Sequence, residues 1–232
     1  KMGTAVAHLA RTSGIDVVAT LGAGTVIDSS SLAGAQVAIE FTEPGAAAAN
    51  ARACIIAGCP IVIGTTGWYG ELPEISRLVS EKGGSLLWAP NFSLGVHAVA
   101  RMMRRAGEIF ANLPTFDAAL VETHHAEKKD APSGTARMLQ EKFAEGSARE
   151  VPITSVRVGS VPGTHTLILD GGFEQIVISH EARDRRVFAE GALVAARWLI
   201  GRRGVFTLDD VLSNEEVRSN RQFPCCVVLA PR

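Results

Sequence analysis

Apolar and polar residues alternate along the first half of the chain in a pattern of short strands separated by helices. Four apolar runs predict strands, at residues 15–21, 35–41, 60–63 and 85–88. Helices are predicted between them, at the alanine-rich stretch 46–57 and at 71–82. The run 60–63 is apolar throughout, which is typical of a strand buried on both faces of a parallel sheet. This alternation predicts an α/β fold with a doubly wound parallel sheet.

The pattern changes in the second half of the chain. Apolar residues recur at helical spacing from residue 93 to residue 113, which predicts one long helix. Strands are then predicted at 117–123, 153–158, 164–170 and 174–180, with helices only at 135–145 and 189–202. Consecutive strands without helices between them predict a second α+β domain built on a mixed or antiparallel sheet.

Composition excludes several classes of function. The chain has 232 residues, of which 47% are apolar and 20% charged, and its formal net charge is −1. This balance leaves no basic excess to attract nucleic acid or an anionic membrane surface. No apolar run approaches the roughly 20 residues that a membrane-spanning helix needs. The four cysteines form no Cys-x-x-Cys pair, which predicts reduced thiols and a cytoplasmic protein.

The first residues have the pattern of the end of a dinucleotide-binding turn. Lys1, Met2 and Gly3 lead into a helix of small residues, and a glycine at that place lets helix and sheet approach closely. The strand that precedes such a turn is missing from the sequence, and an ordinary amphipathic helix is the alternative interpretation. Gly22 stands where an acidic residue would bind the adenosine ribose, so the sequence favours neither NADH nor NADPH.

Two polar turns follow successive predicted strands. They are Gly64–Thr65–Thr66–Gly67 and Ala89–Pro90–Asn91–Phe92–Ser93. Ligands of open α/β sheets bind beyond the carboxyl ends of the strands, so we expect both turns to line one crevice. Taken singly, each is equally well explained as a tight turn.

The densest chemical signal is the block ETHHAEKKDAPSGTA at 122–136. His124 and His125 can exchange protons near neutral pH, and Lys128 adds a cation four residues beyond the first histidine. The start of a helix at 133–135 offers free N–H groups to a carboxylate. These features predict a pocket for a small anionic substrate, with a solvated polar loop as the alternative. Adjacent histidines rarely chelate one ion, so no metal site is predicted.

The later histidines and arginines carry a weaker signal. His165 and His180 lie on predicted strands and are candidates for the same cleft, although each is more commonly a structural histidine held by hydrogen bonds. The arginine-rich stretch 183–186 is most simply a solvated turn.

The block at 122–136 resembles the signature of bacterial 4-hydroxy-tetrahydrodipicolinate reductase, also called dihydrodipicolinate reductase. The resemblance is colinear over about residues 1–212 and includes IEFTEPG (39–45), IGTTGW (63–68), APNFSLGV (89–96), PGTHTLIL (162–169) and SHEARDRRVFAEGAL (179–193). It implies NADPH- or NADH-dependent reduction of 4-hydroxy-tetrahydrodipicolinate with loss of water, in diaminopimelate and lysine biosynthesis. Other Rossmann amino-acid or semialdehyde dehydrogenases and a non-catalytic ligand sensor are the alternatives.

The resemblance also assigns residues. His124 matches the acid–base group and Lys128 the proton donor, while substrate is bound by His125, Gly134 and Thr135. The matching cofactor-binding positions are Lys1, Met2, Gly64, Thr65, Thr66, Ala89, Pro90, Asn91 and Phe92. Arg185 matches an arginine near the active site.

The family's architecture is a Rossmann domain followed by an α+β domain whose sheet assembles a homotetramer. We therefore expect a dinucleotide-binding domain at 1–92 plus about 189–212. Residues 93–188 are expected to bind substrate and form the oligomer, and the tail 213–232 has no assigned role. Because the first strand is missing, we expect this chain by itself to bind the cofactor poorly.

Overall fold

The structure is a computed structural model that describes residues 2–213 and 225–230. Two compact units divide the chain, one formed by Lys1–Ser93 together with Arg186–Arg232 and the other by Leu94–Arg185. Within the described residues, no helix is both long and apolar enough to cross a lipid bilayer.

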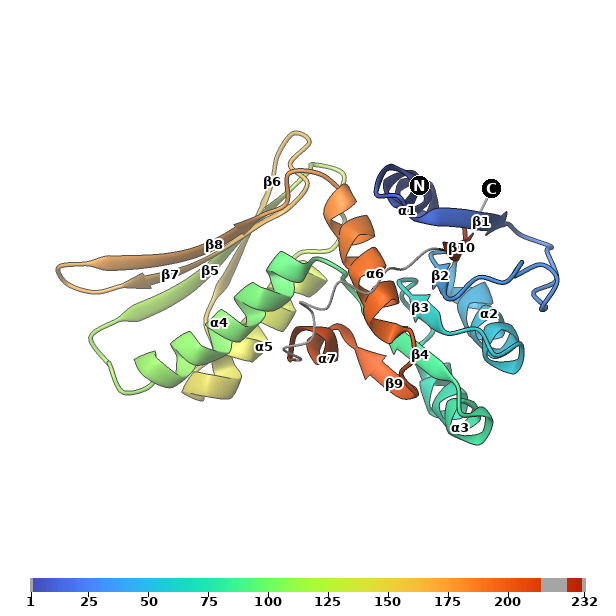
Figure 1. The fold of residues 1–232 in the computed structure, drawn as a ribbon. Coiled ribbons are helices and arrows are strands. Elements are labelled where there is room, and N and C mark those ends of the chain that lie inside the picture. The colour runs from blue at the N-terminus through green and yellow to red at the C-terminus, as the bar shows by residue number, and fades with distance from the viewer. Residues whose placement is uncertain (1, 214–224, 231–232) are drawn as a thin grey trace. The chain divides into compact units, whose positions relative to one another are not determined.

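The first unit is built on a parallel sheet of six strands (Figure 1). Their order across the sheet is β1 (Asp16–Leu21), β10 (Cys225–Leu229), β2 (Ala38–Glu40), β3 (Ile61–Ile63), β4 (Ser85–Trp88) and β9 (Gly204–Thr207). The helices of this unit are α1 (Met2–Thr12), α2 (Pro44–Ile56), α3 (Leu72–Lys82), α6 (Arg186–Leu199) and α7 (Leu208–Ser213), with a short 3₁₀ helix at Tyr69–Glu71. Helix α6 packs on β2, β3 and β4 and against α1, whereas α2 packs against α3. The predicted doubly wound sheet is therefore confirmed.

Local sequence explains where these helices begin and end. Pro44 occupies the first turn of α2, where its missing N–H leaves no intrahelical bond unmade. Helix α3 ends at Gly83, which adopts the left-handed conformation with φ of 60°. The strands between the helices are buried on both faces, and Ile39, Ile61 and Leu86 are fully inaccessible to solvent.

Strand β10 occupies a position that the sequence analysis treats as missing. It pairs in parallel with β1 on one side and with β2 on the other, and is the second strand from one edge of the sheet. Its residues belong to the segment 213–232, to which no role was assigned. Strand β9 and helix α7 were likewise not predicted.

The second unit contains a mixed sheet in the order β6 (Ile153–Arg157), β5 (Asp117–His124), β7 (Thr164–Asp170) and β8 (Gln175–Glu181). Strands β5 and β6 are parallel, and β7 is antiparallel to both β5 and β8. The helices are α4 (Leu94–Phe110) and α5 (Gly134–Ser147), which pack closely together. A Cβ at Gly107 would lie 2.2 Å from the carbonyl oxygen of Phe143, so only glycine permits this approach. The prediction of a second, mixed sheet is confirmed.

Candidate active site

Strand β5 presents Glu122 and His124 on the same face, because side chains two residues apart in a strand point the same way. Glu122 is fully buried and His124 is 7% exposed. The neighbouring strand β7 places His165 directly opposite Glu122. The His124 and His165 rings meet edge to face, with 5.1 Å between their centroids. Three strand residues therefore form one buried cluster.

Glu122 is the centre of this cluster. Its Oε1 accepts hydrogen bonds from Arg157 Nη2 at 2.7 Å and from the Ser133 backbone N–H at 3.3 Å. Its Oε2 is hydrogen-bonded to His124 Nδ1. Burial by itself raises the pKa of Glu122, but hydrogen bonds from Arg157, Ser155 and His124 outweigh it and lower the pKa to about 2. Glu122 is therefore a carboxylate at neutral pH.

The Glu122 carboxylate fixes the tautomer of His124. Because the carboxylate accepts a hydrogen bond, it places a proton on Nδ1 and leaves Nε2 as the nitrogen that exchanges protons. Burial lowers the pKa of His124, and Lys128 and Arg157 lower it further, while Glu122 opposes them. His124 is accordingly neutral near pH 7 in the unliganded chain. Gly163 leaves room for its ring, since a Cβ there would lie 2.9 Å from Nε2.

His165 supports the cluster from β7. Its Nε2 lies 3.2 Å from Ser133 Oγ, and burial lowers the pKa of His165 to about 4. Ligand atoms of Glu122, His124 and His165 lie within 4.8 Å of one another, a spacing that a metal ion could bridge. However, the Arg157 guanidinium already neutralises Glu122, and a second cation beside it would be repelled. The arrangement favours a proton-transfer network, and the expectation of no metal stays a prediction.

Lys128 and His125 lie on the loop after β5. The Lys128 ammonium donates a hydrogen bond to Asp130 Oδ1 at 2.6 Å, and its side chain is 23% exposed. The loop turns tightly here, since the Lys128 backbone N–H donates to the His125 carbonyl at 3.1 Å. Lys128 is close enough to His124 to affect its pKa. The loop therefore brings a cation near the buried histidine.

The same loop ends at the start of α5. Ser133 caps this helix, and its hydroxyl accepts the Ala136 N–H at 3.1 Å. Gly134 and Thr135 are the first residues of the helix. Gly134 is exposed, and a Cβ at this position would meet no atom within 4 Å. A hydrogen bond from the Gly134 backbone helps to lower the pKa of the Asp130 carboxylate, so the helix start already interacts with one carboxylate, as the helix dipole favours.

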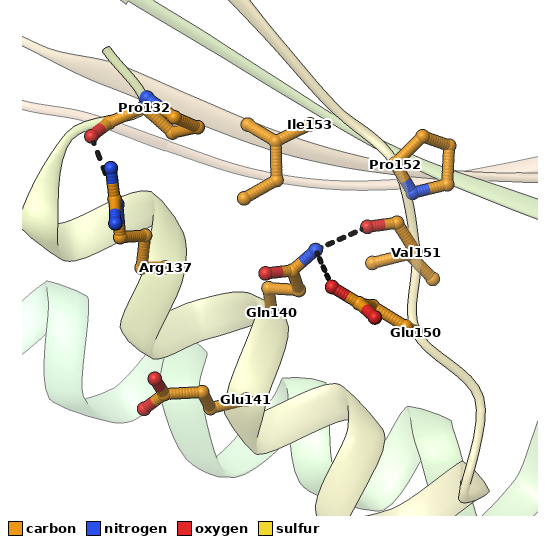
Figure 2. A pocket seen from close by; sticks show the side chains of 8 residues that line it. All are labelled: Pro132, Arg137, Gln140, Glu141, Glu150, Val151, Pro152 and Ile153. Carbon is orange, nitrogen blue, oxygen red and sulfur yellow. Dashed lines mark hydrogen bonds between the residues drawn. The ribbon is translucent and has the colours of Figure 1, made fainter.

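A surface pocket of about 780 Å³ lies on another side of α5, and none of the predicted site residues line it. Figure 2 shows Gln140 reaching from the helix to the Val151 carbonyl, which accepts its hydrogen bond at 2.6 Å. Arg137 donates to the Pro132 carbonyl at 3.4 Å, close to the helix start (Figure 2). These bonds hold α5 against the loop that precedes it and against the residues that lead into β6.

In the first unit, the two predicted turns lie next to each other, at the carboxyl ends of neighbouring parallel strands. They follow β3 and β4, which pair with Ile63 beside Trp88. A Cβ at Gly64 would lie 2.1 Å from the Phe41 ring, so glycine is required there. The Thr65 hydroxyl is buried without a hydrogen-bond partner. A buried polar group at a strand end, next to a glycine turn, fits a dinucleotide cofactor.

The turn after β4 contains the remaining predicted cofactor residues, which are Ala89, Pro90, Asn91 and Phe92. The Ala89 N–H donates to the Ile63 carbonyl at 3.3 Å, and Asn91 Oδ1 accepts the Ser93 N–H at 2.8 Å. Phe92 is 2% exposed and packs edge to face on Phe41. These contacts fix the turn at 89–92 next to the turn at 64–66.

Lys1, Met2 and Arg185 are the remaining residues that were predicted to belong to the site. Lys1 lies outside the described residues, whereas Met2 opens α1. Arg185 is exposed, three residues after Ala182, whose N–H donates to the Gly163 carbonyl at 2.9 Å. Since Gly163 packs on His124, the chain around Arg185 comes close to the cluster, and its role stays a prediction.

The sequence analysis missed the partners of His124. Glu122 could have been found, because it precedes His124 by two residues on a predicted strand. Arg157 and Ser133 gave no such signal, since only the register of β5 against β6 and the cap of α5 bring them to the carboxylate.

A doubly wound sheet with glycine turns at its strand ends, joined to a unit with a buried histidine and a nearby lysine, defines a two-domain nicotinamide-dependent oxidoreductase. Residues 1–92 match the family described as Dihydrodipicolinate reductase, N-terminus, and residues 95–212 match Dihydrodipicolinate reductase, C-terminus. The chain belongs to the dihydrodipicolinate reductase family. It is an oxidoreductase of diaminopimelate and lysine biosynthesis, and the alternative functions are not favoured.

Individual relatives agree with this assignment. A 4-hydroxy-tetrahydrodipicolinate reductase of Christiangramia forsetii is 35% identical over 190 residues, covering 77% of this chain and 80% of the relative. One of Myxococcus xanthus is 37% identical over 214 residues, covering 81% and 77%. A dipicolinate-bound dihydrodipicolinate reductase from Paenisporosarcina sp. TG-14 shares the fold, with a TM-score of 0.66 at 23% identity over 75% of this chain and 73% of that one.

Proposed function

We propose that this chain reduces 4-hydroxy-tetrahydrodipicolinate to tetrahydrodipicolinate with loss of water, using His124 and Lys128 for proton transfer. The observation that carries the proposal is the buried Glu122–His124 pair, which lies beside a lysine and an open helix start. A group that exchanges protons, a cation and a carboxylate-binding site are what reduction of a small anionic imine requires.

The substrate would be held through its carboxylates. We assign one carboxylate to the backbone N–H groups of Gly134 and Thr135 at the start of α5, with His125 as a further contact. Arg185 is assigned to the second carboxylate, because its segment lies near the cluster and it is exposed. A relative crystallised with dipicolinate, a planar dicarboxylate, supports this class of ligand.

Loss of the substrate's hydroxyl group as water gives a conjugated imine, for which the nicotinamide would supply the hydride when bound. Negative charge then grows on the substrate, and the Lys128 ammonium offsets it and donates a proton. A nearby dianion raises the pKa of His124, which is neutral in the unliganded chain, so His124 can take up a proton as substrate binds. Glu122 keeps Nδ1 protonated, so this exchange takes place at Nε2.

The cofactor is assigned to the first unit. Its proposed contacts are the turns at 64–66 and 89–92, together with Met2 at the start of α1. Lys1, which is also assigned to the cofactor, lies outside the described residues. The buried, unpartnered hydroxyl of Thr65 supports this placement. The second unit is assigned to substrate binding and to assembly.

We also propose a cytoplasmic homotetramer without nucleic-acid or membrane partners. Support for assembly comes from apolar side chains left exposed on the mixed sheet of the second unit, including Val156 at 38% and Val177 at 52%, which the strand register places on the same face. Exposed apolar residues grouped on one sheet are typical of a subunit interface.

The function is tested by following oxidation of NADPH and NADH with freshly generated 4-hydroxy-tetrahydrodipicolinate. We expect turnover with at least one cofactor, and a loss of about 100-fold or more in kcat for His124→Ala, since a general acid–base contributes that much. An exposed histidine, His8, provides the control as His8→Ala. Absence of oxidation with either cofactor would refute the proposal.

A further inference from the structure

Glu40 is a buried acidic residue that takes no part in the proposed reaction. It is the last residue of β2, it is fully inaccessible to solvent, and it belongs to the motif IEFTEPG at 39–45. Burial of a carboxyl group costs free energy unless hydrogen bonds compensate for it. The Oε2 atom of Glu40 has no hydrogen-bond partner among the described residues, so this compensation is incomplete. An apolar side chain would fill the position at a lower cost, which indicates that the carboxyl group has a further role.

The carboxyl group of Glu40 fixes the residue two positions further along the chain. Its Oε1 accepts hydrogen bonds from the backbone N–H of Thr42, at 2.8 Å, and from the Thr42 hydroxyl. Asn50 in α2 donates a further hydrogen bond to the same hydroxyl, at 3.3 Å. Thr42 is therefore tied both to the end of β2 and to helix α2.

Phe41 lies between these two residues and packs on both turns that are assigned to the cofactor. A Cβ at Gly64 would lie 2.1 Å from the Phe41 ring, so the ring covers the backbone of the turn at 64–66. The ring also meets Phe92, in the turn at 89–92, edge to face with 5.9 Å between the centroids. One aromatic ring therefore joins the two turns, and the residues on either side of it are linked by the Glu40 carboxyl group.

We infer that Glu40 is a positioning residue for the nicotinamide cofactor, whose carboxyl group fixes Thr42 and thereby holds the Phe41 ring against the turns at 64–66 and 89–92. This inference rests on the proposed assignment of the cofactor to those turns. Because Glu40 is fully buried, it acts through Phe41 and not by contact with the cofactor.

The effect on binding follows from the fraction of molecules in which both turns are in place. Without the hydrogen bonds between Glu40 and Thr42, the Phe41 ring leaves its position in part of the population. A cofactor then binds only to the remaining molecules, and its apparent dissociation constant rises by the factor by which their fraction falls.

Two substitutions of Glu40 test this role. Glu40→Met fills the same space without an acceptor, so Thr42 loses two hydrogen bonds, and the dissociation constants of NADPH and NADH should rise by about tenfold or more. Glu40→Gln keeps a carbonyl oxygen that can accept both hydrogen bonds, and its dissociation constants should stay within about threefold of those of the unaltered chain. The fluorescence of the bound nicotinamide measures binding, and circular dichroism shows whether each variant is folded.

A substitution in the core of the same unit provides the control. Ile75 in α3 is fully buried, so Ile75→Val leaves a small cavity and should lower the midpoint of urea unfolding. It should leave both dissociation constants unchanged, because a loss of stability alone does not displace the Phe41 ring.

A double variant tests whether the effect of Glu40 passes through Phe41. Phe41→Leu removes the ring that contacts both turns and should itself weaken binding by about tenfold. If Glu40 acts through this ring, Glu40→Met/Phe41→Leu binds at most about threefold more weakly than Phe41→Leu. Independent effects would multiply to a loss of about 100-fold and would overturn the inference.

The outcomes separate this inference from the proposed function. Unchanged binding by folded Glu40→Met, or binding by Glu40→Gln as weak as that of Glu40→Met, overturns the inference alone. If Glu40→Met does not fold, Thr42→Val decides, because it removes only the hydroxyl and should raise both dissociation constants by about threefold or more. Unchanged values for Thr42→Val overturn the inference. Failure of the unaltered chain to bind either cofactor overturns the inference together with the proposed use of NADPH or NADH.

Discussion

Replacement of Glu122 by glutamine tests the proton-transfer network most directly. Glutamine keeps the shape of the side chain but removes the charge that Arg157 and His124 share. The folded chain lowers the pKa of this carboxyl from 4.5 to about 2. A shift of this size corresponds to about 3 kcal/mol of stabilisation of the charged form at neutral pH. We therefore expect Glu122→Gln to lower the free energy of unfolding by about 3 kcal/mol.

The direction of this pKa shift determines how the free energy of unfolding depends on pH. A carboxyl whose pKa is lowered on folding contributes its full stability above pH 4.5, and this contribution is lost as the pH falls towards 2. The difference between the unaltered chain and Glu122→Gln should accordingly be constant above about pH 4.5 and shrink below it. Urea unfolding followed by circular dichroism at several pH values measures this difference. Glu174→Gln, at an exposed position of the same unit, is the matched control.

The pH profile of kcat/KM distinguishes a role of Glu122 in proton transfer from a purely structural role. Because Glu122 raises the pKa of His124, its replacement should shift the limb of the kcat/KM profile due to His124 to lower pH. Loss of the fixed tautomer should also lower kcat by about 100-fold or more. An unfolding free energy within about 1 kcal/mol of the unaltered chain, together with an unshifted limb, would refute the role assigned to Glu122.

Three further predictions concern other parts of the chain. The pKa of His165 falls from 6.5 to about 4 on folding. The free energy of unfolding should therefore decrease by about 3 kcal/mol as the pH falls from 6.5 to 4, because the unfolded chain binds the proton more readily. In urea unfolding, His165→Asn should make this free energy depend less on pH between 6.5 and 4. Gly134→Val should obstruct the open start of α5 and weaken dipicolinate binding by about tenfold or more in titration calorimetry, with Gly172→Val as control. Gly107→Ala would force α4 from α5 and should lower the unfolding free energy by about 1–3 kcal/mol in denaturant titrations.

Local patterns in the sequence predicted most of the elements but not their partners. The strand 85–88 and the helix at 71–82 follow from periodicity and from Pro and Gly at the helix ends, which are signals within a few residues. Strand β10 has no such signal, because its five residues pair with strands about two hundred residues earlier. A short apolar run reveals neither its neighbours nor its direction, so its place in the sheet required the structure.

The same limit applies to the candidate site. His124 ends β5, and His125 and Lys128 lie on the loop that follows, so their grouping is visible in the sequence. The ion pair between Arg157 and Glu122 joins residues 35 positions apart, and it exists only because β6 pairs in parallel with β5. Sequence motifs therefore predict the groups proposed to contact the substrate, while the groups that orient them are brought together by the register of the sheet.

Substitutions among the residues on the strands should change different kinetic parameters from substitutions at the start of α5. Three strands hold the proton-transfer network, with Glu122 and His124 on β5, Arg157 on β6 and His165 on β7. The proposed carboxylate site lies instead at the start of α5, which is held by its own cap at Ser133. Changes in the strand network should alter protonation, and hence kcat and its pH profile, whereas changes at the helix start should mainly raise KM. The two supports meet at the Ser133 hydroxyl, which caps α5 by accepting the Ala136 N–H and lies 3.2 Å from His165 Nε2. Ser133→Ala removes both contacts and should therefore affect both parameters together, although the backbone N–H of residue 133 still donates to Glu122.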